Sequence, residues 1–205
     1  KKKKRPMKQK KKKKKNERKN KASMPLVVRG KDLLFLRNLA PDDREVTFSF
    51  QTQANGLLAD VTSTVGEPCY DRDGAWSNRC GVPPLHGQYA AHTHPMGNRV
   101  SSSDFVNAIQ MHPHFGGTRE VSAVLGPGGV FHYRPTPELL AKWESWTAFT
   151  RAKKKDEWKA EGLRQQDRTQ GGDVAEYVTY FQGEGFELDY QSWDYIDAEA
   201  TLVLR

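Results

Sequence analysis

The chain has 205 residues and a formal net charge of +8, with 36% hydrophobic and 28% charged residues. This composition can build one hydrophobic core of roughly 100–150 residues, and no stretch approaches the ~18 uninterrupted apolar residues of a membrane span. Residues 1–21 hold 15 basic residues and one acid, which leaves a net charge of −6 on residues 22–205. We therefore expect an acidic folded domain behind a basic arm, which excludes a surface built throughout for nucleic acid.

Residues 1–24 form the expected arm, and residues 25–205 the expected domain. Met7 is the sole apolar residue before Ala22, so the arm cannot bury enough surface to offset the entropy lost on ordering. We expect it to be disordered unless a partner orders it. Three functional interpretations stay open beside that of a solubilising tail: a nuclear-localisation signal, an arm that binds nucleic acid, and an arm that docks on an acidic protein surface.

Alternating apolar and polar residues mark the first elements of the domain. Leucines recur over residues 33–39 and fit either a short helix or a strand. Residues 45–53 alternate with a period of two and predict a strand. Residues 54–56 (ANG) signal a turn, so residues 57–64 predict a second strand and the two form a hairpin.

Two cysteines, Cys69 and Cys80, lie in a polar segment that we expect to be a loop. Their spacing suits either a disulfide that closes the loop or two unrelated thiols. A single pair of cysteines does not identify a redox compartment, so both alternatives stay open.

The second half of the domain mixes helices and strands. Residues 87–92 predict a short buried strand, and the serines at 101–103 offer N-cap residues for a helix over 105–112. The further expected elements are a hairpin over 121–134, a long helix over 137–166 with Trp143, Trp146 and Phe149 in its packed face, a helix over 173–181, and closing strands over 186–190 and 200–204. This order predicts an α+β fold with one mixed central sheet flanked by helices.

His92 and His94 stand two residues apart at the end of the strand predicted over 87–92. Alternate residues of an extended chain point to the same side, so both imidazoles can reach one ion. Asp104, at the start of the following helix, approaches from a third direction. Two histidines and one carboxylate leave a fourth tetrahedral position for water, which is the layout of a catalytic zinc site.

Hydrolysis at such a site needs a carboxylate outside the metal sphere to take a proton from the water. Glu45, which opens the first predicted strand, is the candidate base, with Glu67 as the alternative. The hydroxyl of Ser101 is placed to stabilise a developing oxyanion, and Ser102 is the alternative for this role.

Four other histidines receive ordinary interpretations. His112 and His114 imitate the paired motif but lie at a predicted helix end without an acid in register, so we do not expect them to bind metal. His86 and His132 are expected at the surface or half-buried.

The pattern of an upstream Glu, then His-x-His-Pro, then Ser-x-x-Asp resembles that of the JAMM/MPN (JAB) metalloprotease family. The resemblance covers residues 45–134, with six residues between His94 and Ser101 where the family usually has seven. It implies a JAMM-like domain of cytidine deaminase-like layers, and zinc bound by His92, His94 and Asp104. It also implies hydrolysis of isopeptide or peptide bonds, often those of ubiquitin-like proteins, with Glu45 as base and Ser101 as oxyanion helper.

Two alternatives to the hydrolase stay open. Some members of this family have lost their ligands and act as scaffolds, so the chain is otherwise a structural subunit of a large viral or nucleoprotein assembly, anchored by residues 1–21. A plain DNA- or RNA-binding protein is less favoured because the domain is acidic and lacks a stacking-aromatic motif. The expected location is inside the cell, with the nucleus as one destination, or within such a particle.

The arm generates a test. If residues 1–21 bind nucleic acid, the logarithm of the affinity should fall with the logarithm of the salt concentration, with a slope of about −0.9 per phosphate neutralised. Deleting these residues should remove binding in a filter or fluorescence titration without unfolding the domain. Binding that survives the deletion, or that ignores salt, would instead place the interface on the acidic domain.

Overall fold

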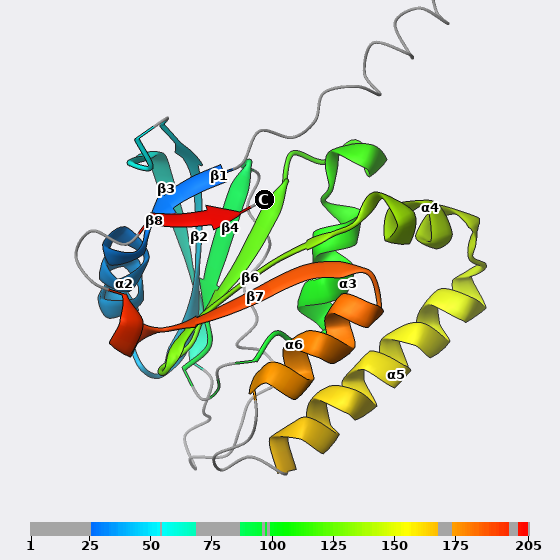
Figure 1. Cartoon of the computed structure of the whole chain (residues 1–205). Helices are drawn as coiled ribbons and strands as arrows, with labels where there is room; N and C mark the ends of the chain where they lie inside the picture. The colour runs from blue at the N-terminus through cyan, green and yellow to red at the C-terminus, as the bar shows by residue number, and fades with distance from the viewer. Residues whose placement is uncertain are drawn as a thin grey trace, which may run out of the picture.

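A six-stranded sheet forms the centre of the computed structural model (Figure 1), which describes residues 26–53, 55–68, 87–95, 97, 99–167, 174–196 and 201–204. The strand order is β3-β2-β4-β5-β6-β7. The strands are β2 (Arg44–Thr52), β3 (Leu58–Pro68), β4 (Tyr89–Thr93), β5 (Val121–Leu125), β6 (Gly129–Pro135) and β7 (Phe186–Ser192). Strands β4 and β5 run parallel and the other neighbours antiparallel, which confirms the expected α+β class with a mixed sheet.

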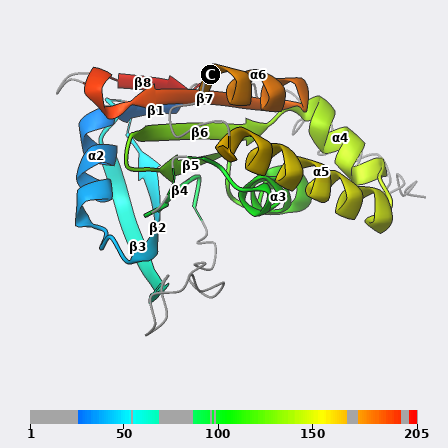
Figure 2. The same cartoon turned by 90° about the horizontal axis from the view of Figure 1, so that it is seen from below.

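Helices and a small second sheet surround the central sheet. Strands β1 (Leu26–Arg29) and β8 (Thr201–Leu204) pair with each other, next to α2 (Gly30–Leu39). The remaining helices are α3 (Ser102–Gln110), α4 (Pro137–Ser145), α5 (Ala148–Asp167) and α6 (Val174–Gly183), with short 3-10 turns η2 (Pro113–Phe115) and η3 (Trp193–Tyr195). Helix α2 lies at one end of the view in Figure 2, while α3 to α6 gather toward the other.

Two buried clusters lie on opposite faces of the sheet, because successive strand residues point to opposite sides. Tyr89 and Ala91 of β4 belong to the cluster that includes Leu33 of α2. The other cluster joins Phe105 of α3 to residues of β6, α5 and α6. His92 alternates with Ala91 and therefore faces the α3 side of the sheet.

The prediction of one long helix over residues 137–166 is wrong, because α4 and α5 are separate helices. Trp146 takes an extended conformation with φ −74° and ψ 143°. The hydroxyl of Thr147 accepts the Thr150 N–H at 3.2 Å, which starts a new helix in place of continuing the old one. Trp143 is buried, as expected. Phe149 was expected in the packed face of the helix but is 79% exposed.

Other expectations are resolved or lie outside the described residues. Residues 33–39 belong to helix α2, and β8 pairs with β1 instead of closing the central sheet. The arm (1–24), Cys69, Cys80 and His86 are outside the described part of the chain. Within that part, no helix has both the length and the apolar character needed to cross a membrane.

His132 of β6 is fully buried, with 3% of its surface exposed, which corrects the expectation of a surface or half-buried residue. It packs edge-on against Tyr89, with ring centroids 6.0 Å apart. Its Nε2 finds no hydrogen-bond partner among the described residues, and its strand neighbour Asp189 is exposed. Burial lowers the pKa of His132 to about 3, so this imidazole is neutral in the folded state.

This burial predicts an acid-sensitive stability. In the unfolded chain His132 has a pKa of about 6.5, so it binds a proton as the pH falls below this value. In the folded chain the pKa is about 3, so the same proton binds only in stronger acid. The free energy of unfolding therefore decreases as the pH falls from about 6.5 toward 3. At pH 5 this linkage costs about 2 kcal/mol. Urea unfolding at pH 7 and pH 5 gives the change in the free energy of unfolding between the two pH values. This change should be smaller in His132→Phe than in the wild type. An equal change in both proteins would contradict the argument.

Candidate metal centre

The pairing of β2 with β4 sets the positions of three site residues. Thr47 lies opposite His92 in this antiparallel pair. Continuing the same register by two residues places Glu45 opposite His94, and paired residues share a face of the sheet. Glu45, His92 and His94 therefore all project from the face covered by α3.

Asp104 reaches the site from the first turn of α3. Ser101 is the N-cap residue, and its hydroxyl accepts the Asp104 N–H at 3.2 Å. The Asp104 carboxylate accepts the Ser101 N–H at 2.8 Å, which completes a capping box. This reciprocal pair satisfies two N–H groups at the helix start and fixes the direction of the carboxylate, so the capping role and a ligand role coexist.

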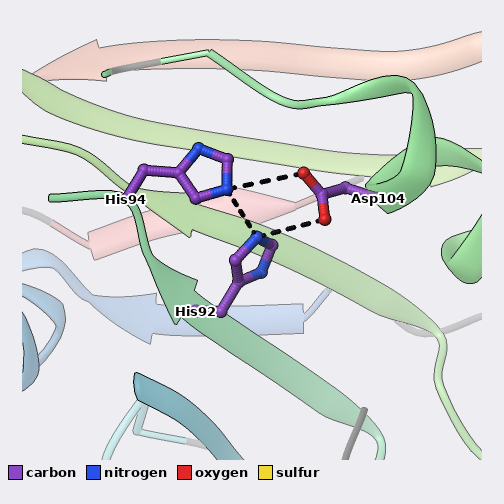
Figure 3. A group of neighbouring side chains, drawn as sticks. All are labelled: His92, His94 and Asp104. Atoms are coloured by element: carbon purple, nitrogen blue, oxygen red, sulfur yellow. Dashed lines mark hydrogen bonds and ion pairs between the residues drawn. The ribbon is translucent and has the colours of Figure 1, made fainter. Parts of the chain in front are cut away.

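The three side chains point toward one another (Figure 3). Nε2 of His92 lies 3.0 Å from Nε2 of His94 and 3.2 Å from Oδ1 of Asp104, and Nε2 of His94 lies 3.5 Å from Oδ2 of Asp104. Neighbouring donors on a tetrahedral zinc with bonds of 2.0–2.1 Å are about 3.3 Å apart. One ligand atom from each residue lies within 4.8 Å of the other two, so these residues could hold a metal ion such as zinc.

No second group of this kind occurs in the described part of the chain: His92, His94 and Asp104 alone bring three His, Cys, Asp or Glu ligand atoms within 4.8 Å of one another. The side chains of His92 and His94 are each 16% exposed and that of Asp104 is 14% exposed. The cluster is thus largely, though not fully, removed from water.

A backbone carbonyl fixes the tautomer of His94. Its Nδ1 lies 2.9 Å from the carbonyl oxygen of Arg99, which can only accept, so Nδ1 carries the hydrogen. In the neutral ring the lone pair is then on Nε2, which points at His92 and Asp104. This is the arrangement that an imidazole needs in order to bind a metal through Nε2.

Burial and mutual charges separate the pKa values of the cluster. Burial and the charge of His92 lower the pKa of His94 to about 4. Burial opposes the charged form of His92 as well, but the charge of Asp104 and its hydrogen bond raise the pKa of His92 above the usual value. Although burial acts to raise the pKa of Asp104, the charge and hydrogen bond of His92, with His94 and Ser101, hold it well below its usual range. The pKa of His92 is therefore raised, while those of His94 and Asp104 are lowered.

Glu45 borders the cluster without joining it. Its Oε1 lies 4.0 Å from Nε2 of His94, and its side chain is 16% exposed. Burial raises the pKa of Glu45 to about 7, against the charge of His92 and together with that of Asp104. The carboxylate is close enough to act on a molecule held beside His94.

The alternatives considered from the sequence lie elsewhere. Glu67 is exposed near the end of β3, and no contact between it and the cluster is seen. Ser102 is the first residue of α3, whereas Ser101 makes the reciprocal contacts with Asp104. His114 pairs with Glu144 at 3.1 Å, and its N–H is accepted by Nδ1 of His112, so this pair is engaged away from the cluster.

Two supports of the site were not expected from the sequence. The Thr93 hydroxyl accepts the buried Val46 N–H at 2.9 Å and so ties the residue after Glu45 to the residue between the histidines. The second support is the Arg99 carbonyl on His94. The position of Thr93 between two histidines could have indicated the first support, because alternate strand residues point to opposite faces of the sheet. The second support has no sequence signature, because any residue type provides a backbone carbonyl.

Comparisons with known proteins give no relative. A scan against protein-family models found no match, and searches of the curated proteins and of the solved structures found none.

The contact between Thr93 and Val46 predicts a measurable stability effect. Thr93→Val keeps the shape of the side chain but leaves the buried Val46 N–H without its acceptor, which should cost about 1–3 kcal/mol. Thr93→Ser keeps the hydroxyl and should lose less. Urea unfolding compares the three proteins, and equal free energies of unfolding for the wild type and Thr93→Val would show that this hydrogen bond contributes nothing.

Proposed function

We propose that the chain is a zinc-dependent hydrolase of the JAMM type that cleaves isopeptide or peptide bonds. The observation that carries this proposal is the convergence of His92, His94 and Asp104 at separations of 3.0, 3.2 and 3.5 Å, with Glu45 beside them. These three residues would hold the zinc ion. When bound, the ion would polarise a carbonyl and make bound water acidic near neutral pH.

Glu45, Ser101 and Asp104 have different roles in the proposed hydrolysis. Glu45 takes the proton of the attacking water and returns it to the leaving amine, the role its place 4.0 Å from His94 permits. The Ser101 hydroxyl accepts the Asp104 N–H and is the proposed donor to a developing oxyanion. Asp104 holds charge at the helix start, where the helix dipole favours an anion.

The substrate class comes from the resemblance of the motifs to the JAMM/MPN family, which implies isopeptide bonds to ubiquitin-like proteins. The sheet with its one parallel pair, β4 and β5, and the helix α3 that follows β4 are compatible with that resemblance. In this proposal the motif core runs from β2 to β6, and α4 to β8 complete the domain.

The test combines zinc content with hydrolysis. Glu45→Gln keeps the shape of the side chain and the three ligands but removes the base, so hydrolysis of a ubiquitin dimer joined through a lysine should fall by about 10²–10⁴-fold. Its zinc content, measured by elemental analysis, should equal that of the wild type. His92→Ala should lose both zinc and hydrolysis.

His112→Ala is the matched control, because it removes an imidazole from outside the cluster and should leave zinc and hydrolysis unchanged. A wild-type protein that folds but takes up no zinc would overturn the proposal. Loss of zinc in Glu45→Gln would make Glu45 a ligand rather than the base.

A second candidate is a non-catalytic subunit of a large viral or nucleoprotein assembly that uses the same fold. The observation that favours it is the segregation of charge, with 15 basic residues and one acid within residues 1–21. Such a segment would bind the phosphates of nucleic acid or an acidic protein surface. A zinc-free, folded wild type with salt-sensitive binding through these residues would support this candidate over the hydrolase.

A further inference from the structure

Tyr177 of α6 reaches into the segment that connects the histidines to Asp104. Its hydroxyl donates to the carbonyl oxygen of Val100 at 2.5 Å, across 77 positions of sequence. Tyr177 is 0% exposed and Val100 is 3% exposed, so the hydrogen bond is shielded from water. We infer that Tyr177 is a positioning residue for the metal centre, an inference that rests on the proposed metal-binding function.

Tyr177 contacts residues 99–101, and this segment orients two of the candidate ligands, His94 and Asp104. Arg99 provides the carbonyl that accepts the Nδ1 hydrogen of His94 at 2.9 Å. Ser101 forms the capping box that fixes Asp104. Val100 lies between them, so one hydrogen bond to its carbonyl holds the backbone between both orienting contacts.

Tyr177 also contacts the neighbouring residue through its ring. The guanidinium carbon of Arg99 lies 5.5 Å from the centroid of the Tyr177 ring, within the range of a cation–π attraction. The hydroxyl and the face of one aromatic side chain thus engage two consecutive residues, and both contacts restrict the position of the Arg99 carbonyl.

The ring itself is held from the core side. Its centroid lies 5.6 Å from that of Phe131 on β6 and 4.8 Å from that of Phe181 on α6. Because these neighbours are buried, the Tyr177 hydroxyl has a fixed position relative to the sheet. Tyr177 therefore transmits the rigidity of the core to the 99–101 segment.

Removing the hydroxyl should loosen this segment and leave the ring packing intact. Tyr177→Phe deprives the buried Val100 carbonyl of its donor, so the 99–101 backbone can shift away from the geometry that orients His94 and Asp104. Loss of an outer contact that orients a metal ligand typically weakens metal binding by about 10–100-fold. We expect that loss in a zinc titration against a competing chelator.

Tyr190→Phe is the matched control. The Tyr190 hydroxyl also donates to a backbone carbonyl, that of Gly128 at 3.0 Å, but Gly128 lies in the turn between β5 and β6, which carries no ligand. This variant should bind zinc as the wild type does. Equal weakening in both variants would mean that loss of any tyrosine hydroxyl that donates to a backbone carbonyl explains the effect, which would overturn the inference.

A second readout needs no metal. In the metal-free protein the Nδ1 hydrogen of His94 should give a slowly exchanging imidazole signal in proton–nitrogen NMR spectra, because Arg99 accepts it. Tyr177→Phe should broaden or remove this signal while the backbone spectrum stays that of a folded protein. Arg99→Gln, which removes the cation from the ring, should produce a smaller loss of zinc affinity and tests the ring contact if Tyr177→Phe does not fold.

The two readouts distinguish the failures. A wild type that binds no zinc would overturn the proposed function, yet the NMR comparison would still decide whether Tyr177 orients His94. A wild type that binds zinc, with a Tyr177→Phe variant of equal affinity and an unchanged His94 signal, would overturn the inference and leave the proposed function standing.

Discussion

The reciprocal contact between Ser101 and Asp104 is the constraint on which the site depends. Helix α3 must begin with its free N–H groups satisfied, and the capping box does so with the carboxylate that also faces the histidines. A change that unwinds this helix start therefore moves a candidate ligand. The same Asp104 carboxylate therefore stabilises the start of the helix and sets the geometry of the candidate metal centre.

The sheet supplies the other half of the geometry. The register that sets Thr47 opposite His92 brings Glu45 opposite His94, and a shift of one residue would send every one of these side chains to the other face. The large apolar residues of β2, Phe48 and Phe50, are buried in the cluster that includes Leu33 of α2 and make such a shift costly. The core on one face of the sheet thereby protects the position of the polar side chains on the other.

Sequence patterns predicted the parts of this architecture that depend on local chemistry. The period-two alternation of residues 45–53 identified β2, and the serines before Asp104 identified the start of α3, because strand alternation and helix capping are short-range effects. The break at Trp146 and Thr147 escaped prediction because both flanking segments have strong helical patterns, and one threonine hydroxyl decides the boundary.

Long-range features were not legible for a different reason. The burial of His132 follows from β6 lying between β5 and β7 in the sheet, which its own sequence does not state. The contact of Tyr177 with Val100 joins positions 77 residues apart, and its acceptor is a backbone carbonyl that any residue type could provide. The residue types at the site are therefore visible in the sequence, while the contacts that orient them are not.

The charges and hydrogen bonds of the cluster couple its side chains to one another. Two imidazoles and two carboxylates, each 14–16% exposed, lie together in a region where an unpaired charge is costly. The charge of Asp104 and its hydrogen bond raise the pKa of His92 against its burial, while Nε2 of His94 keeps a lone pair turned toward both. In the proposed metal-bound state, His92, His94 and Asp104 would hold a divalent cation, which would balance the negative charge of Asp104. Each of these side chains is therefore held by the charges and hydrogen bonds of the others.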